Sequence, residues 1–356
     1  MRRVYLIRHG RPELPGDGHV CLGTTDLPLS PLGRLQACLT GEALRGQTLT
    51  VFASPLSRAY ETARFLAPEP IVLPGLREYH TGDWDGLSFS EIRERWPELY
   101  AARGDDPAIP IPNAEDYGAG QRRFLDAVRE TLAQSKGNIA VVAHAGVMGA
   151  LLSALLGSRE YDDHKYRPPY GGWYVLEAEG DRLTPRLPFE TAKPELTDAL
   201  CRKLLDAVPL PGHIIAHSEA VAKEAVRIGA ALNASGLRLD VPLIRRAALV
   251  HDLARLEKNH AETGAQWLET LGYPLEAAIV RRHHDPDSDT INESTVVYLA
   301  DKCVQGADPV PLEARFLESR KKCRDSEALA AHERRRRQAL SLAAAVNTQC
   351  DQEVIR

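Results

Sequence analysis

Apolar runs and helical periods alternate along the first half of the chain. Four consecutive apolar residues at 4–7 predict a buried strand, and residues 30–44, with Ser30 as N-cap and Pro31 at the first position, predict a helix. The same patterns predict further strands at 50–54, 138–144 and 171–181, the last of these closing the domain, and helices at 57–67 and 146–157. Such alternation is typical of an α/β domain.

The second half of the chain changes to an almost continuous helical period. Its apolar residues recur on one face in several successive segments, which are 197–208, 218–235, 242–256, 261–272, 295–305 and a long C-terminal stretch. Pro and polar residues at 189–197 separate the two patterns. We therefore expect an α/β domain over residues 1–190 and an all-α domain over 197–356, with a core at 199–306 and C-terminal helices at 310–356.

Composition narrows the classes of protein that fit this plan. With 356 residues, two domains are the expectation, and a net charge of −5 gives no general reason to expect binding to nucleic acid or membranes. The six cysteines include no CxxC pair, which argues against a disulfide framework or a zinc ribbon. No apolar run suits a signal peptide or a membrane span, so we expect a cytoplasmic protein. The basic run at 333–338 is interpreted as a solvated helix face.

Basic and imidazole side chains gather at the predicted ends of three strands. Arg8 and His9 follow the first strand, Arg58 lies just beyond the second, and His144 ends the third. Ligands of open α/β sheets collect at the carboxyl ends of strands, so these four side chains are expected to share one pocket. Two guanidinium groups beside two imidazoles favour a phosphate ligand.

This pocket predicts a phosphoryl-transfer reaction that needs no metal. A neutral His9 nitrogen can attack phosphorus and form a phosphohistidine that water then hydrolyses. Arg8, Arg58 and His144 would stabilise charge on the transferring group, and Glu78 is a candidate acid for the leaving oxygen.

Four motifs in this order give a resemblance to a known family. The segments RHG at 8–10, SPLSRAYETA at 54–63, LREYHTGDWDG at 76–86 and VVAHAG at 141–146 resemble the histidine phosphatase superfamily. The resemblance implies a three-layer phosphoglycerate mutase-like fold, His9 as nucleophile, Arg8, Arg58 and His144 as the phosphate pocket, and Glu78 as proton donor. The segment CLGTTDLPLSPLGRLQA at 21–37 is most similar to the α-ribazole phosphatase branch. Asp85 stands where Glu is commoner in the family, which we interpret as tolerated.

The helical half holds a second concentration of possible ligands. Six of the 12 histidines lie between His213 and His284. We predict a divalent metal site, most plausibly for two ions, made by seven side chains: His217, His251, Asp252, His260, His283, His284 and Asp301. Imidazole and carboxylate donors suit iron, manganese, magnesium, nickel or zinc.

The pair His251–Asp252 is expected on a helix entered from an apolar face, where a bound metal would offset the cost of burying charge. Two ions bridged by Asp252 would activate a hydroxide that attacks a phosphate ester. Arg255 or Lys302 would add a phosphate contact. His213 is interpreted as structural.

The order of these ligands resembles the HD-domain phosphohydrolase superfamily. Its motifs are similar to LVHDLAR at 249–255, HAETGA at 260–265, RRHHD at 281–285 and YLADK at 298–302. The resemblance implies a metal-dependent hydrolase that acts on a nucleotide.

The leading hypothesis is a bifunctional enzyme, with a phosphomonoesterase for a small-molecule phosphate ester joined to a metal-dependent nucleotide hydrolase. Two alternatives remain open at this point. In one, the HD half is a non-catalytic module that binds metal and nucleotide and regulates the phosphatase. In the other, the whole chain binds phosphorylated ligands without catalysis.

Overall fold

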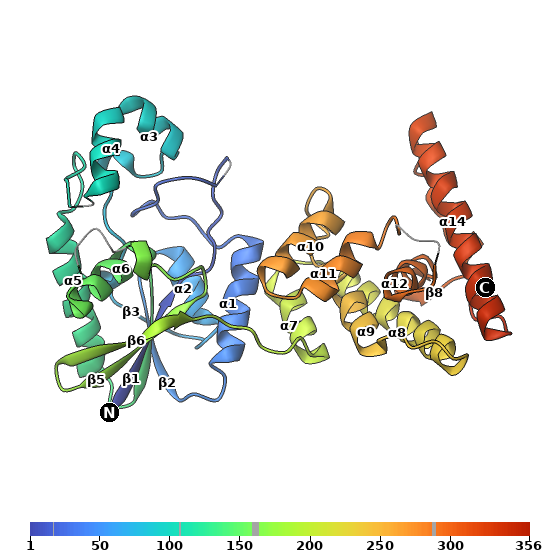
Figure 1. The fold of residues 1–356 in the computed structure, drawn as a ribbon, viewed down its shortest axis with the longest axis horizontal. Helices are drawn as coiled ribbons and strands as arrows, with labels where there is room; N and C mark the ends of the chain where they lie inside the picture. Colours follow the sequence, from blue (N-terminus) through green and yellow to red (C-terminus); the bar gives the residue numbers. More distant parts are fainter. Residues whose placement is uncertain (17, 107, 159–163, 287–289) are drawn as a thin grey trace. The chain divides into compact units, whose positions relative to one another are not determined.

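The computed structural model divides the chain into two compact units, Met1–Pro194 and Glu195–Arg356. The structure describes residues 1–16, 18–106, 108–158, 164–286 and 290–356. Each unit is described below by itself (Figure 1).

A six-stranded sheet forms the centre of the first unit, in the order β3-β2-β4-β1-β5-β6. Strands β1 to β4 run parallel to one another, whereas β5 and β6 add to the β1 side of the sheet in antiparallel fashion. The strand bounds are Arg2–Arg8 for β1, Leu49–Ala53 for β2, Ile71–Val72 for β3, Asn138–Ala143 for β4, Trp173–Glu179 for β5 and Arg182–Glu190 for β6. The expectation that the sheet ends with the strand at 171–181 is wrong, because β6 follows it. β6 is mostly exposed and therefore lacks a clear apolar alternation.

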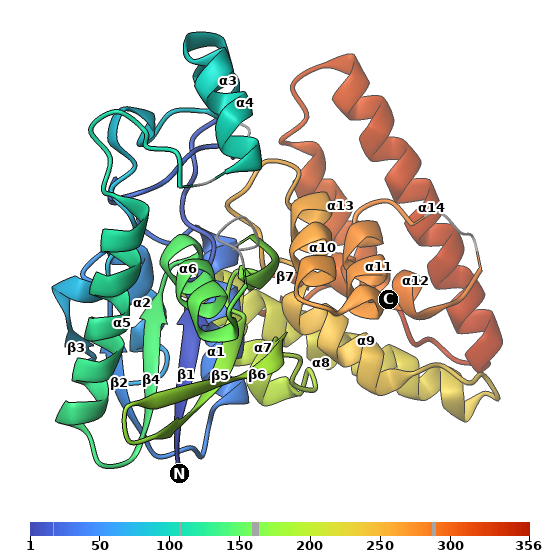
Figure 2. The same cartoon turned by 60° about the vertical axis from the view of Figure 1, so that its left-hand side comes forward.

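Helices cover both faces of this sheet and complete the three layers (Figure 2). The face covered by α5 and α6 holds the larger core, which includes Phe124 and Met148. On the other face α1 and α2 pack against a smaller core that includes Ala59. The helix bounds are Pro31–Ala43 for α1, Ser57–Arg64 for α2, Tyr117–Gln134 for α5 and Ala145–Leu156 for α6. Ser30 caps α1 as predicted, since its side chain accepts from the backbone N–H of Gly33.

A small helical cluster lies in the connection between β3 and α5. It consists of the 3₁₀ turns η1 (Pro74–Leu76) and η2 (Gly82–Trp84) and the helices α3 (Phe89–Arg95) and α4 (Pro97–Asp105). Trp84, Ile92 and Ile111 form its own small core. These elements matter for function because the loop that carries Glu78 leads into them.

The second unit is helical, with one short hairpin. Its helices are α7 (Asp198–Ala207), α8 (Gly212–Ala234), α9 (Val241–Val250), α10 (His260–Thr270), α11 (Pro274–Arg282), α12 (Glu293–Lys302), α13 (Leu312–Arg320) and α14 (Ser326–Cys350). The two-residue strands β7 (Val304–Gln305) and β8 (Asp308–Pro309) pair in antiparallel fashion. Among the described residues, no helix combines the length and apolar character needed to cross a membrane.

The segment around His251 differs from the expected helix over 242–256. Helix α9 ends at Val250, and His251 is its C-cap residue. Asp252 therefore lies in the turns that follow, where Arg255 donates its backbone N–H to the carbonyl of Asp252 at 2.9 Å. The apolar period continues past the helix because Leu253 and Ala254 are also buried, and this continuation misled the sequence prediction.

Candidate active sites

Parallel pairing places His9 and His144 next to each other. Arg8 at the end of β1 is in register with Ala143 at the end of β4, so the next residue of each strand leaves the sheet at the same level. The two imidazole rings lie 5.0 Å apart between centroids, and both are almost fully buried. Ser54 follows the adjacent strand β2, and its hydroxyl lies 2.7 Å from Nε2 of His144. Three neighbouring strand ends thus build the base of one site, as the sequence predicted.

The backbone selects one tautomer of His9. Its Nδ1 lies 2.6 Å from the carbonyl oxygen of Gly10, which can only accept a hydrogen bond. Nδ1 therefore carries the proton, and Nε2 is left with a free lone pair. Burial, and then the positive charges of Arg58 and Arg8, hold the pKa of His9 well below its ordinary value of 6.5. The ring is neutral at physiological pH, which is the form a nucleophile requires.

The two arginines are held mainly by carbonyl groups. Arg8 donates to the carbonyl of Pro168 at 2.9 Å, and its guanidinium lies 3.9 Å from the ring centroid of Tyr170. Arg58 is 1% exposed and donates to the carbonyls of Gly23 and Thr25 at 2.7 and 2.9 Å. Among the described residues, neither arginine's Nε has a partner. A buried donor without a partner is costly, and an anionic ligand would remove that cost.

Glu78 lies at the same end of the sheet, against the first turn of α6. Its two carboxylate oxygens accept the backbone N–H groups of Gly146 and Val147, each at 2.9 Å. The backbone N–H of Tyr79 donates to it at 3.0 Å. These hydrogen bonds to the first turn of α6 fix the position of the carboxylate. Of the five residues that the sequence predicted for this site, Arg8, His9, Arg58 and Glu78 line one cavity, and His144 lies beside His9.

That cavity has a volume of about 780 Å³, far more than a phosphate group fills. Arg8, His9, Arg58 and Glu78 line its inner end. Aromatic and aliphatic side chains from the connection between β3 and α5 line much of the remainder, among them Trp84, Phe89, Tyr100, Ile109 and Ile111.

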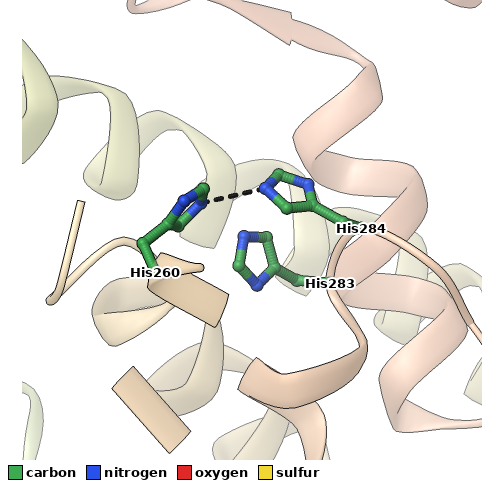
Figure 3. A group of neighbouring side chains, drawn as sticks. All are labelled: His260, His283 and His284. Atoms are coloured by element: carbon green, nitrogen blue, oxygen red, sulfur yellow. Dashed lines mark hydrogen bonds between the residues drawn. The ribbon is translucent and has the colours of Figure 1, made fainter. Parts of the chain in front are cut away.

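In the second unit the seven predicted ligands come together in two adjoining groups. His260, His283 and His284 form one group, shown in Figure 3, in which Nε2 of His260 and Nε2 of His284 lie 2.9 Å apart. His217, His251 and Asp252 form the other. Asp301 joins the second group, because its carboxylate lies 3.1 Å from Nε2 of His217. Each group offers three donor atoms within 4.8 Å of one another.

Backbone carbonyls orient three of these histidines in the same way. Nδ1 of His217, His251 and His283 lies 2.8, 2.7 and 2.6 Å from the carbonyl oxygens of Gly306, Ala248 and Val280. Each Nδ1 therefore donates. Nε2 of His251 and of His283 is left without a hydrogen-bond partner among the described residues, whereas Nε2 of His217 faces the carboxylate of Asp301. This arrangement is typical of histidines that bind metals.

Asp252 lies between the two groups. One carboxylate oxygen is 3.3 Å from Nε2 of His260 and 3.8 Å from Nε2 of His283, and the other is 3.6 Å from Nε2 of His251. Among the described residues, three atoms here are buried and have no hydrogen-bond partner: Oδ1 of Asp252, Nε2 of His251 and Nε2 of His283. These orphaned donor atoms show that the residues fit a bound cation.

Electrostatics in this site also match metal binding. Burial lowers the pKa of His283 to about 3 and that of His284 to about 2, so both are neutral ligands at pH 7. Burial alone would raise the pKa of Asp252, but the neighbouring imidazoles outweigh it and lower the pKa. The pKa of Asp301 is also lowered, because Lys302 and His217 outweigh the opposite effect of burial.

Arg255 and Lys302, which were predicted to contact phosphate in this domain, both contact predicted metal ligands. Lys302 donates to Asp301 at 2.6 Å, and Arg255 lies 3.5 Å from Asp252 and 3.0 Å from Nε2 of His260. His213 is exposed at the beginning of α8 and belongs to neither group.

Comparison with known families agrees with this geometry. A model of the histidine phosphatase superfamily (branch 1) matches residues 4–190, and a model of the HD domain matches residues 214–305. The chain belongs to the histidine phosphatase superfamily. The phosphatase family accounts for more than half of the chain, and the HD domain follows it. Because both are hydrolase families, the chain is a phosphoric ester hydrolase.

Curated relatives match about half of this histidine phosphatase. A glucosyl-3-phosphoglycerate phosphatase of Mycolicibacterium vanbaalenii is 32% identical over 51% of this chain and 81% of its own length. The adenosylcobalamin/alpha-ribazole phosphatase of Escherichia coli is 32% identical over 49% of this chain and 89% of its own. A solved structure of a putative alpha-ribazole-5'-P phosphatase from Escherichia coli is 28% identical, covers 54% of this chain and 98% of that chain, and superposes with a TM-score of 0.48.

Two supporting residues of the phosphatase site were missed by the sequence analysis. Ser54 contacts His144, and Tyr170 stacks under Arg8. Ser54 is the last residue of the strand predicted at 50–54, which pairs with β4, so strand pairing would have indicated it. Tyr170 comes from a loop far along the chain, and we see no local signal for it.

Gly146 serves a different purpose from the one its position suggests. Close approach of a ligand to the backbone is the natural expectation for a glycine at this strand end. Instead, a Cβ at Gly146 would lie 2.7 Å from Oε1 of Glu78, so the missing side chain makes room for the carboxylate. Gly10 likewise packs against the backbone of Gly33.

Replacing Gly146 with alanine is expected to displace Glu78 and remove general acid catalysis. We expect kcat for an alkyl phosphate to fall about 10²-fold. The loss should be much smaller for p-nitrophenyl phosphate, whose leaving group needs no proton. Steady-state kinetics on both esters measure the difference.

Gly137→Ala is the matched control, because no atom lies within 4 Å of a Cβ added there. Equal losses on both esters would contradict the assignment of Glu78 as the displaced acid.

Proposed function

We propose that the phosphatase domain hydrolyses phosphomonoesters through a phosphohistidine at His9. The observation that carries this proposal is the fixed tautomer of a buried, neutral His9, with Nε2 free beside two arginines. The neighbouring imidazole of His144 is held differently, because its Nε2 lies 2.7 Å from the hydroxyl of Ser54.

The reaction follows in two displacements. Nε2 of His9 attacks phosphorus, the P–O bond of the ester breaks, and a P–N bond forms. Arg8, Arg58 and His144 stabilise the charge that spreads over the phosphoryl oxygens. Water then attacks the phosphohistidine, the P–N bond breaks, and orthophosphate leaves.

Glu78 supplies and recovers the proton in this scheme. Three backbone N–H groups hold its carboxyl group in place. In the first step this group donates a proton to the departing alkoxide. In the second step the same carboxylate accepts a proton from the attacking water.

The cavity supports a substrate with a ring-bearing leaving group. Trp84, Phe89 and Tyr100 line the space beyond the phosphate-binding end. Flat aromatic walls suit a base or sugar ring better than a short charged chain. We therefore propose a nucleotide or cofactor-precursor phosphate, in keeping with the α-ribazole phosphatase among the relatives.

We further propose that the HD domain hydrolyses a phosphate ester of a nucleotide. Asp252 and the six side chains around it would hold divalent ions, most simply one per group, with Asp252 between the two groups. Bound ions would supply an activated hydroxide and neutralise phosphate charge. Arg255 and Lys302 lie at the edge of this set and would orient the phosphate. The alternative is a regulatory module that keeps the same ligands without turnover.

Removal of metal separates the two proposed activities. After treatment with EDTA, the full-length protein is expected to keep its phosphomonoesterase activity within about twofold, because His9 chemistry needs no ion. Hydrolysis of a nucleotide panel by the HD domain should be lost and should return with added Mn²⁺ or Mg²⁺.

The measurement is a substrate screen before and after chelation, with bound metal determined in parallel. Loss of all phosphomonoesterase activity on chelation would exclude the proposed His9 mechanism.

A further inference from the structure

Asp85 contacts a short peptide loop, residues 23–25, that connects it to the phosphate site. This residue follows η2, and its carboxylate accepts hydrogen bonds from three consecutive residues, 23–25. One oxygen accepts the N–H of Gly23 at 2.8 Å. The other accepts the N–H groups of Thr24 and Thr25 at 3.0 and 2.9 Å, and the hydroxyl of Thr24 at 3.1 Å. Successive backbone N–H groups around one anion form a stable, well-defined loop conformation.

The opposite side of the same loop holds Arg58. The carbonyls of Gly23 and Thr25 accept from the two terminal nitrogens of its guanidinium, at 2.7 and 2.9 Å. The loop is therefore fixed between a carboxylate on its N–H side and a guanidinium on its carbonyl side. These two bonds leave Nε of Arg58 without a partner among the described residues.

The rest of the loop's surroundings allows it little freedom. A Cβ at Gly23 would lie 2.5 Å from Oγ1 of Thr81 and 2.6 Å from the carbonyl oxygen of Tyr79. Gly86 donates its backbone N–H to the carbonyl of Cys21 at 2.8 Å, immediately before the loop. A change at Asp85 would therefore act on the carbonyls that Arg58 uses.

We propose that Asp85 is a positioning residue for Arg58, which it orients through the carbonyl groups of Gly23 and Thr25. This inference rests on the proposed function, in which Arg58 binds the transferring phosphate. It also gives a role to a residue whose departure from the commoner Glu looked merely tolerated. Asp85 does not touch the substrate; it sets the direction in which the remaining N–H groups of Arg58 point.

A double-mutant cycle with Arg58 tests the proposal. The proteins are the wild type, Asp85→Asn, Arg58→Ala and the double variant, all full-length and metal-free. Isothermal titration with orthophosphate measures binding. An Asn side chain places an N–H₂ donor against the loop's N–H groups, so Asp85→Asn should weaken phosphate binding at least about fivefold when Arg58 is present. In the Arg58→Ala background the same change should matter less than about twofold.

Asp83→Asn is the matched control. Asp83 lies within η2, the 3₁₀ turn that Asp85 follows. Its side chain is exposed, and its carboxylate accepts a hydrogen bond from the side-chain amide of Asn113. This variant should bind orthophosphate as the wild type does. Should Asp85→Asn fail to fold, Gly23→Ala displaces the loop from the other side and should show the same dependence on Arg58.

The outcomes separate this inference from the function on which it rests. Unchanged phosphate binding in Arg58→Ala would overturn the proposed phosphate pocket. A clear loss in Arg58→Ala, together with no effect of Asp85→Asn or an equal effect in both backgrounds, would overturn the positioning role alone.

Discussion

Replacing His9 with alanine is expected to lower phosphomonoester hydrolysis by at least about 10³-fold, because the change removes the atom that forms the covalent intermediate. Binding of orthophosphate should weaken far less, since Arg8, Arg58 and His144 remain. We therefore expect a large fall in kcat and little change in the inhibition constant for orthophosphate. Steady-state kinetics in the presence of EDTA measure the phosphatase domain alone.

A direct trap of the intermediate strengthens this test. Rapid acid-free quenching of the wild type with a ³²P-labelled ester should label the protein, and the label should be lost in acid as phosphohistidines are. His9→Ala should take up none. His213→Ala is the matched control, because it also replaces a histidine with alanine. His213 is exposed at the beginning of α8, in the other unit. Full phosphatase activity in His9→Ala would refute the nucleophile assignment.

The parts of this site that the sequence predicted are those that depend on strand pairing. Arg8, His9 and His144 adjoin runs of buried apolar residues that could only be central strands. The carboxyl ends of parallel strands meet at one edge of a sheet, so a local pattern in each strand was enough to bring distant residues together. A local signal also gave the N-cap Ser30, because the hydrogen bond of its side chain to Gly33 lies within one turn of chain.

The remaining parts depend on loops, whose paths no local pattern sets. Glu78 was found through its motif, but its contact with the first turn of α6 follows from the course of the whole connection between β3 and α5. The role proposed for Asp85 depends on a hydrogen-bonded loop that lies 60 residues earlier in the chain. In the second unit, the apolar spacing predicted a helix over 242–256, whereas α9 ends at Val250. The buried turns that follow α9 keep the apolar periodicity of a helix.

Replacing Asp252 with alanine is expected to remove most of the bound metal from the HD domain and to lower its metal-dependent hydrolysis at least about 10²-fold. Among the described residues, Asp252 is the side chain whose carboxylate approaches histidines of both ligand groups. Its loss would also take a nearby carboxylate away from His260 and His283, which weakens cation binding further. Metal analysis by mass spectrometry and the thermal shift on adding Mn²⁺ measure binding without reference to activity.

Asp206→Ala is the matched control for this change, since Asp206 is exposed on α7 and should leave metal content unaltered. Hydrolysis is best compared in a His9→Ala background, where the phosphatase domain contributes nothing to turnover. There the HD domain should still hydrolyse members of a nucleotide panel, and adding Asp252→Ala should abolish that activity. Metal binding that depends on Asp252 without any hydrolysis by the His9→Ala protein would instead favour the regulatory module. Unchanged metal content in Asp252→Ala would show that the carboxylate between the two groups is not a ligand, because no other carboxylate described in the structure approaches His260.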